Sequence, residues 1–117
     1  MDRLLRATVN TWHGLLAAAR SEAAFRQELA ALFIAVPLAF IVAAEGWKRL
    51  ALIGVVAFVL VVELLNTAIE KLADRVTAAI EPQIGQIKDM GSAAVGLALL
   101  IAGVTWLWAL AERLGLL

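Results

Sequence analysis

Apolar residues gather in three long runs, and charged residues lie before and between them. Uncharged stretches cover residues 29–44, 50–62 and 90–111, and they are 16, 13 and 22 residues long. A membrane-spanning helix needs roughly 20 apolar residues, or about 30 Å of helix. The third run has this length, and the first reaches it if the preceding residues lengthen the same helix. The second run spans only if Glu63, which interrupts its end, lies within the membrane.

Alternation with period two, which the strands of a β-barrel require, is absent throughout. The pattern predicts an all-α, polytopic membrane protein with a single domain over residues 1–117 and spans at about 28–45, 49–69 and 90–111. Residues 1–27 carry apolar side chains every three or four positions, which predicts an amphipathic surface helix region. Ser21 is expected to cap a new helix that starts at Glu22 and runs into the first span. Pro37 is expected to kink that span, and Pro82 and Gly85 to mark the loop before the third.

Lysine and arginine are unevenly divided between the two sides of the membrane. Three spans place the N-terminal segment and residues 66–89 on one side, with seven basic residues, and residues 45–49 and the C-terminus on the other, with three. Because basic residues favour the cytoplasmic side, the N-terminus is expected in the cytoplasm. Trp47, Trp106 and Trp108 would then lie near the outer interface.

The composition fits a membrane protein and narrows the chemistry. Hydrophobic residues make up 63% of the chain and the mean hydropathy is +0.91, whereas soluble domains are about 45–50% apolar. A net charge of zero disfavours nucleic acid as a partner. No cysteine and one histidine exclude a disulfide framework, thiol catalysis and a His-rich metal site within one chain.

The carboxylates are concentrated on one side of the membrane. Eight of the ten lie on the side of the N-terminus or enter the membrane from it. At about 100° per residue, four polar residues fall on one face of the second span, in a stripe about 16 Å long. These residues are Glu63, Asn66, Glu70 and Asp74.

An acid at this depth costs about 2–4 kcal/mol unless it is paired, protonated or hydrated. Glu63 and Asn66 could serve only as hydrogen-bonding links between helices. Several carboxylates on one face repel one another, however, and a divalent cation would relieve this. Mg²⁺ takes one or two carboxylates and completes its shell with water and substrate phosphates. With Arg3 and Lys88 near the same interface, the stripe suggests phosphoryl transfer.

Three segments resemble the prokaryotic membrane-integral diacylglycerol kinases. They are residues 22–28 (EAAFRQE), 63–75 (ELLNTAIEKLADR) and 88–95 (KDMGSAAV). The resemblance implies a multi-pass homotrimer of the bacterial inner membrane, with active sites shared between chains at the cytoplasmic face. It also implies transfer of the γ-phosphoryl group of ATP, with Mg²⁺ as cofactor, to diacylglycerol, giving phosphatidic acid.

By the same resemblance, Glu63 accepts the proton of the lipid hydroxyl, Asn66 orients the site, and Glu22 and Glu70 hold the metal. The implied nucleotide contacts are Arg3, Asn10, Glu22, Glu70, Lys88 and Asp89. The implied contacts with the lipid are Arg3, Trp12, Arg26, Glu63 and Ser92.

The surface helix departs from the family at Thr8, Asn10 and His13, where a small residue, an aromatic residue and a lysine are typical. The resemblance therefore does not determine which residues of the surface helix contact the nucleotide and the lipid. A related enzyme of the same family phosphorylates undecaprenol, which stays an alternative substrate. A small multidrug transporter and a non-catalytic assembly subunit are further alternatives, although the transporters have four spans with the acid in the first.

Overall fold

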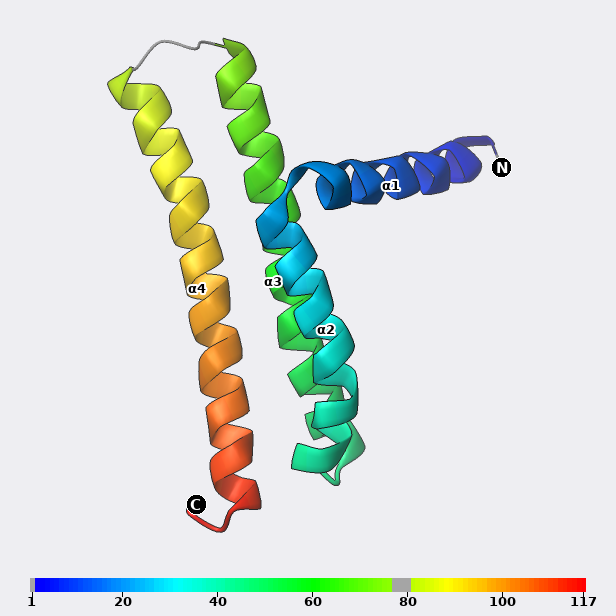
Figure 1. Ribbon diagram of the computed structural model, residues 1–117, viewed down its shortest axis with the longest axis vertical. Coiled ribbons are helices and arrows are strands. Elements are labelled where there is room, and N and C mark those ends of the chain that lie inside the picture. Colours follow the sequence, from blue (N-terminus) through cyan, green and yellow to red (C-terminus); the bar gives the residue numbers. More distant parts are fainter. Residues whose placement is uncertain (1, 77–80) are drawn as a thin grey trace.

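The computed structural model describes residues 2–76 and 81–117, and these residues form four α-helices (Figure 1). Helix α1 is Asp2–Ser21, α2 is Ala23–Val42, α3 is Gly46–Val76 and α4 is Pro82–Arg113. The described residues contain no strand, and α2, α3 and α4 are each long and apolar enough to cross a membrane. The predicted all-α fold with three membrane helices and a surface helix is confirmed.

Helix α1 projects sideways from the other three helices and leaves most of its surface uncovered (Figure 1). Only Ala18, near its C-terminal end, is buried. Leu4, Leu5 and Trp12 are exposed, although they belong to the apolar face of the helix. A helix with one apolar face and no protein against that face suits the plane of the membrane interface.

A single non-helical residue, Glu22, separates α1 from α2. The prediction that Ser21 caps α2 is wrong, because the Ser21 hydroxyl donates a hydrogen bond back to the Ala17 carbonyl and completes the last turn of α1. Glu22 has the extended backbone of an N-cap residue (φ −121°, ψ 113°), and its side chain makes no capping bond. The guanidinium of Arg26 donates to the carbonyls of Ala19 and Arg20, which fixes the angle between the two helices.

Helix α3 is the central helix of the bundle, because it packs extensively against both α2 and α4 while α2 and α4 touch little. The buried positions of α2 and α4 are mostly small, namely Ala35 and Ala39 on α2 and Gly91 and Ala98 on α4. Small residues let membrane helices approach closely, and close packing is the main attraction between helices in lipid. Large apolar side chains such as Phe33 and Leu107 point outward instead, where lipid would surround them.

The helices extend beyond the predicted spans. The predicted spans end at about residue 69 and begin again at about residue 90, yet α3 runs to Val76 and α4 begins at Pro82. The backbone N–H at the first position of a helix has no partner within the helix, so a proline there loses no hydrogen bond. Pro82 accordingly begins α4 and does not lie in a loop. Gly85 lies inside α4, and Pro37 lies inside an uninterrupted α2.

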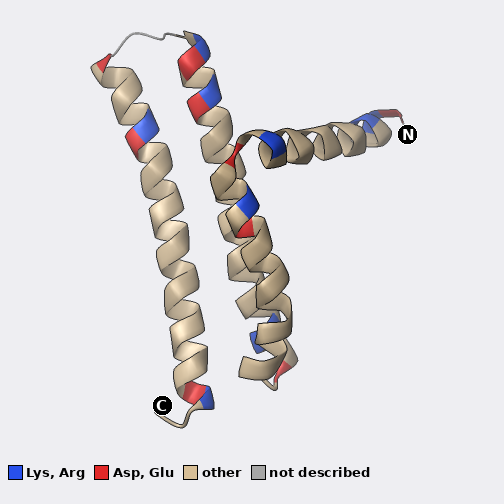
Figure 2. Ribbon diagram, viewed as in Figure 1, with Lys and Arg blue, Asp and Glu red and all other residues tan. Residues whose placement is uncertain are grey.

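At the end of the bundle opposite α1, the turn between α2 and α3 is tied to the end of α4. Lys48 forms salt bridges with Glu45 (3.1 Å) and Glu112 (3.2 Å). The indole of Trp106 donates a hydrogen bond of 3.0 Å to the Leu52 carbonyl. Figure 2 shows that charged residues gather at the ends of the long helices and at the junction of α1 and α2, which leaves a wide uncharged band between them.

Replacing Leu52 by Ala should destabilise this bundle by about 2–5 kcal/mol, because it leaves a cavity among closely packed helices. Leu52 is 1% exposed and packs with Ala39 and Ala43, whereas Leu50 on the same helix is 73% exposed. Leu50→Ala is therefore the matched control, and unfolding in detergent micelles is the measurement. Equal losses in the two variants would contradict the packing described here.

Glu45 should make stability depend on pH. Hydrogen bonds from Lys48 and then Trp47 lower the pKa of the Glu45 carboxyl below its ordinary value. Its contribution is therefore present above the unfolded pKa, about 4.3, and is lost as the pH falls through the lower folded pKa. Thermal unfolding of wild type and Glu45→Gln should differ slightly at about pH 7, and the difference should shrink as the pH falls through the lowered pKa of Glu45. A constant difference would argue against the ion pair.

Candidate active site

Polar residues interrupt the buried face of α3 toward its C-terminal end. Glu63 and Asn66 are only 7% and 8% exposed. Together with Glu70 and Asp74 they form the acid stripe, whose members were predicted to share one face. The inner members do face the neighbouring helices, because the buried positions Leu52, Val59, Glu63, Asn66 and Ala73 recur every three, four or seven residues. The stripe is thus a continuation of the apolar packing face of α3.

The stripe starts inside the apolar layer and leaves it toward the water. A span of roughly 20 residues counted from Gly46, the first residue of α3, ends near Leu65. Glu63 falls inside this length, while Glu70 and Asp74 lie one to three turns beyond it. The acid stripe therefore crosses the boundary between the hydrocarbon and the interface.

Carboxylates from α2 and from the α1–α2 junction join the stripe. The negative charges of Glu70 and Glu22 act on the Glu63 carboxylate, and Glu63 in turn acts on Glu28. The junction is held against α3 by an apolar cluster of Ala18, Phe25 and Leu60. This packing brings the predicted residues Glu22, Glu63 and Glu70 together within one chain.

Glu28 is a member of this group to which the sequence reasoning gave no role. One of its carboxylate oxygens, Oε2, is buried without a hydrogen-bond partner among the described residues. Its spacing of three from Phe25 and seven from Ala35, both buried, could have shown that it lies on the packed face of α2. The acid stands at a position where helix packing calls for an apolar residue.

The amide of Asn66 connects the two halves of the stripe. Its Nδ2 donates a hydrogen bond of 3.2 Å to Oε1 of Glu70. Further toward the water, Lys88 of α4 forms a salt bridge of 2.6 Å with Asp74. Lys88 therefore lies at the outer end of the stripe, and its neighbour Asp89 is exposed.

Other predicted site residues lie apart from the stripe. Arg3, Asn10 and Trp12 are exposed on α1, whose N-terminal half extends away from the bundle (Figure 1). Arg26 is exposed and holds the end of α1, as described above. Ser92 is exposed on α4, next to the buried Gly91. A single chain thus assembles the acids of the site but not the predicted contacts from α1.

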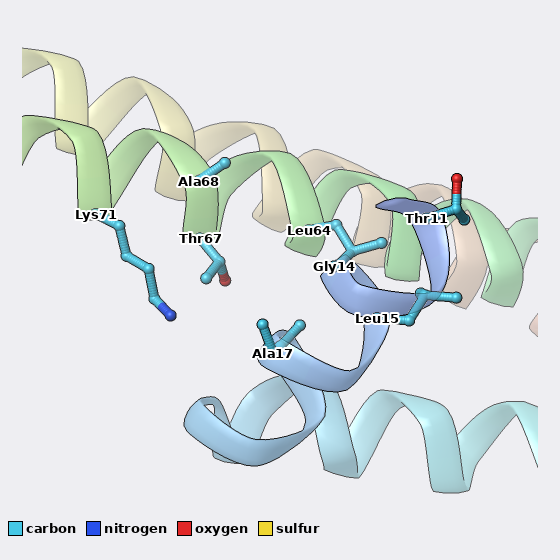
Figure 3. A pocket seen from close by; sticks show the side chains of 9 residues that line it. Thr11, Gly14, Leu15, Ala17, Leu64, Thr67, Ala68 and Lys71 are labelled. Carbon is cyan, nitrogen blue, oxygen red and sulfur yellow. The ribbon is translucent and has the colours of Figure 1, made fainter. Parts of the chain in front are cut away.

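A groove of about 380 Å³ lies between α1 and α3, beside the stripe. Leu15 of α1 and Leu64 of α3 line it, and Lys71 stands at one end (Figure 3). The Lys71 ammonium donates a hydrogen bond of 2.9 Å to Ser21. With apolar walls and a cation at its edge, the groove matches the chemistry of a lipid better than that of a polar metabolite.

The donor set fits a cation that is shared with a substrate. Among residues 2–76 and 81–117, no group of three or more His, Cys, Asp or Glu could hold a metal ion alone. Glu22 and Glu70 are two carboxylates that each lie near enough to Glu63 to act on its charge, and Mg²⁺ commonly uses one or two carboxylates with water and phosphate oxygens. The repulsion among the acids would also favour a cation there. Mg²⁺ brought in with a polyphosphate therefore fits, whereas a permanent metal centre does not.

Comparison with known proteins agrees with this chemistry. The family model described as prokaryotic diacylglycerol kinase matches residues 9–110. The chain is 43% identical over 104 residues to a diacylglycerol kinase of Escherichia coli K12, covering 89% of this chain and 85% of the relative. It is also 43% identical over 106 residues to one of Pseudomonas aeruginosa PAO1, covering 91% and 86%. A Haemophilus influenzae diacylglycerol kinase is 35% identical over 106 residues, covering 91% and 90%.

Proposed function

Because the chain belongs to the prokaryotic diacylglycerol kinase family, we propose that it transfers the γ-phosphoryl group of ATP to the hydroxyl of diacylglycerol and produces phosphatidic acid. The observation that carries this proposal is the buried Glu63 at the edge of the apolar layer, with Glu22 and Glu70 beside it. A lipid hydroxyl lies at this depth. ATP approaches from the water, so the acid stripe extends from the depth of the lipid hydroxyl to the side from which ATP arrives.

Glu63 acts as the general base. A primary hydroxyl is a weak nucleophile, and a carboxylate positioned to accept its proton contributes about 10²–10⁴-fold to the rate. As the proton moves to Glu63, the lipid oxygen bonds to the γ-phosphorus, the bond between that phosphorus and the bridging oxygen breaks, and ADP leaves. Burial of Glu63 supports this role, because its carboxylate is shielded from competing water.

Glu22 and Glu70 hold Mg²⁺ together with ATP oxygens. When bound, the ion neutralises charge on the phosphates as the γ-phosphoryl group is transferred. Asn66 holds the Glu70 carboxylate in place through its amide hydrogen bond. Lys88, Asp89 and the α1 residues Arg3 and Asn10 contact the nucleotide. The Lys88 ammonium, which pairs with Asp74 in the free chain, would also donate hydrogen bonds to a phosphate of ATP.

The lipid lies beside α1, with its hydroxyl at Glu63 and contacts from Arg3, Trp12, Arg26 and Ser92. The groove between α1 and α3 supports this placement, since its apolar walls can receive part of an acyl chain. The enzyme is a homotrimer of the bacterial inner membrane with its sites facing the cytoplasm. Shared sites would explain why Arg3, Asn10 and Trp12 lie apart from the stripe within one chain.

Purified protein in mixed micelles with dioleoylglycerol and MgATP should produce phosphatidic acid. Glu63→Gln should lower turnover by about 10²–10⁴-fold and leave nucleotide binding unchanged, because only the proton acceptor is lost. Glu81→Gln, an exposed acid at the same end of the bundle, is the matched control. Phosphorylation of undecaprenol but not of dioleoylglycerol would show that the polyprenol is the substrate. Turnover of Glu63→Gln near that of wild type would show that Glu63 is not the general base.

Glu70→Gln should raise the Mg²⁺ concentration required for half-maximal activity by about tenfold or more, because one of two protein ligands is weakened. Titration of activity with Mg²⁺ at saturating ATP measures this change. The same Glu81→Gln variant should titrate like wild type. A Glu70 variant with an unaltered Mg²⁺ requirement would show that the carboxylate is not a ligand.

A further inference from the structure

The Asn66 side chain occupies an unusual position for an amide. It is buried between α3 and α4, and only one of its two polar atoms has a protein partner. The Nδ2 group donates to Glu70 at 3.2 Å, while Oδ1 is buried without a hydrogen bond among the described residues. A primary amide can exchange its two ends by rotating, and the Glu70 carboxylate selects this orientation because it accepts a hydrogen bond only from the NH₂ end.

Gly91 of α4 provides the space that this orientation needs. A Cβ atom on Gly91 would lie closer to Oδ1 of Asn66 than real Cβ atoms approach other atoms, and 3.2 Å from Cγ. Only a hydrogen at this position leaves room for the carbonyl. Gly96 and Gly103 of the same helix are different, because a Cβ on either would meet nothing within 4 Å.

Glycine inside a helix costs about 1 kcal/mol relative to alanine, so Gly91 is an unfavourable choice for α4 itself. The contact of Gly91 with Asn66 explains why a glycine is found there despite its cost to the helix. Lys88, one turn earlier on α4, bonds Asp74 of the stripe. The same segment of α4 therefore contacts the stripe at both Asn66 and Asp74.

We propose that Gly91 is a positioning residue of the active site, which by lacking a side chain leaves the room in which the Asn66 amide holds the carboxylate of Glu70. The proposal rests on the function proposed above, in which Glu70 holds Mg²⁺. A methyl group at position 91 must rotate the amide of Asn66 or separate α4 from α3. Rotation breaks the bond to Glu70 that the Asn66 amide now makes, and separation of the helices loosens the packing that holds the amide in place.

The test compares Gly91→Ala with the matched control Gly96→Ala. In Gly91→Ala we expect kcat to fall by about tenfold to a hundredfold with a higher Mg²⁺ requirement, and the thermal midpoint to fall. Gly96→Ala should retain wild-type turnover and a midpoint no lower than wild type, because alanine favours the helix. Wild-type turnover and Mg²⁺ requirement in Gly91→Ala would overturn the proposal.

A double-mutant cycle separates positioning from general helix contact. In the Asn66→Ala background the obstructing amide is gone, so adding Gly91→Ala should cost little further stability. If Gly91→Ala alone fails to fold, the double variant should still fold. An equal loss of thermal midpoint in both backgrounds, or a double variant that also fails to fold, would show that α4 needs glycine for another reason and would overturn the proposal.

The amide itself gives a direct readout. The chain has two asparagines, Asn10 and Asn66, so selective ¹⁵N-asparagine labelling gives two side-chain amide signals, and Asn66→Ala assigns them. Gly91→Ala should shift the Asn66 signal and Gly96→Ala should not; an unmoved signal would contradict the proposal. The amide signal and the thermal cycle do not need lipid turnover. A wild-type chain without kinase activity would therefore defeat the proposed function separately.

Discussion

The central constraint in this molecule is the repulsion among carboxylates that helix packing forces into an apolar seam. Glu63 and Glu28 lie on the faces through which α3 and α2 pack; Glu22 and Glu70 act on Glu63, and Glu63 acts on Glu28. In a medium of low polarity these charges interact strongly over several ångströms. A cation, bound protons or penetrating water can lower the energy of these charges. The fold therefore favours the binding of such partners beside these carboxylates.

The carboxylates at the two ends of the bundle differ in whether basic residues of the chain pair with them. At the end away from α1, Lys48 lies between Glu45 and Glu112 and forms a salt bridge with each of them within the chain. At the other end, the only salt bridge among the described residues joins Lys88 to Asp74, and none involves Glu22, Glu28, Glu63 or Glu70. Charge is partly balanced where the helices must be held together. It stays unbalanced where a phosphate-bound cation is proposed to enter.

The sequence predicted the fold and the acid stripe because both follow from periodicity along a single helix. Glu63 and Asn66 share a face whatever lies beside them. Features that arise between helices were harder to predict: the role of Glu28 depends on which face of α2 meets α3, and that of Gly91 depends on the register of α4 against Asn66. The Ser21 prediction failed because a serine hydroxyl can bond backward within its own helix as well as forward as a cap.

The length of α3 ties the site to the thickness of the bilayer. Its 31 residues form a rod of about 46 Å, against a hydrocarbon layer of about 30 Å. The excess of about 16 Å matches the length of the acid stripe. A rigid helix anchored by Trp47, Lys48 and Arg49 at its start cannot stretch, so a thicker layer of acyl chains would immerse more of the stripe and a thinner one would release it. The thickness of the layer of acyl chains around the enzyme would thus decide how much of the stripe water can reach.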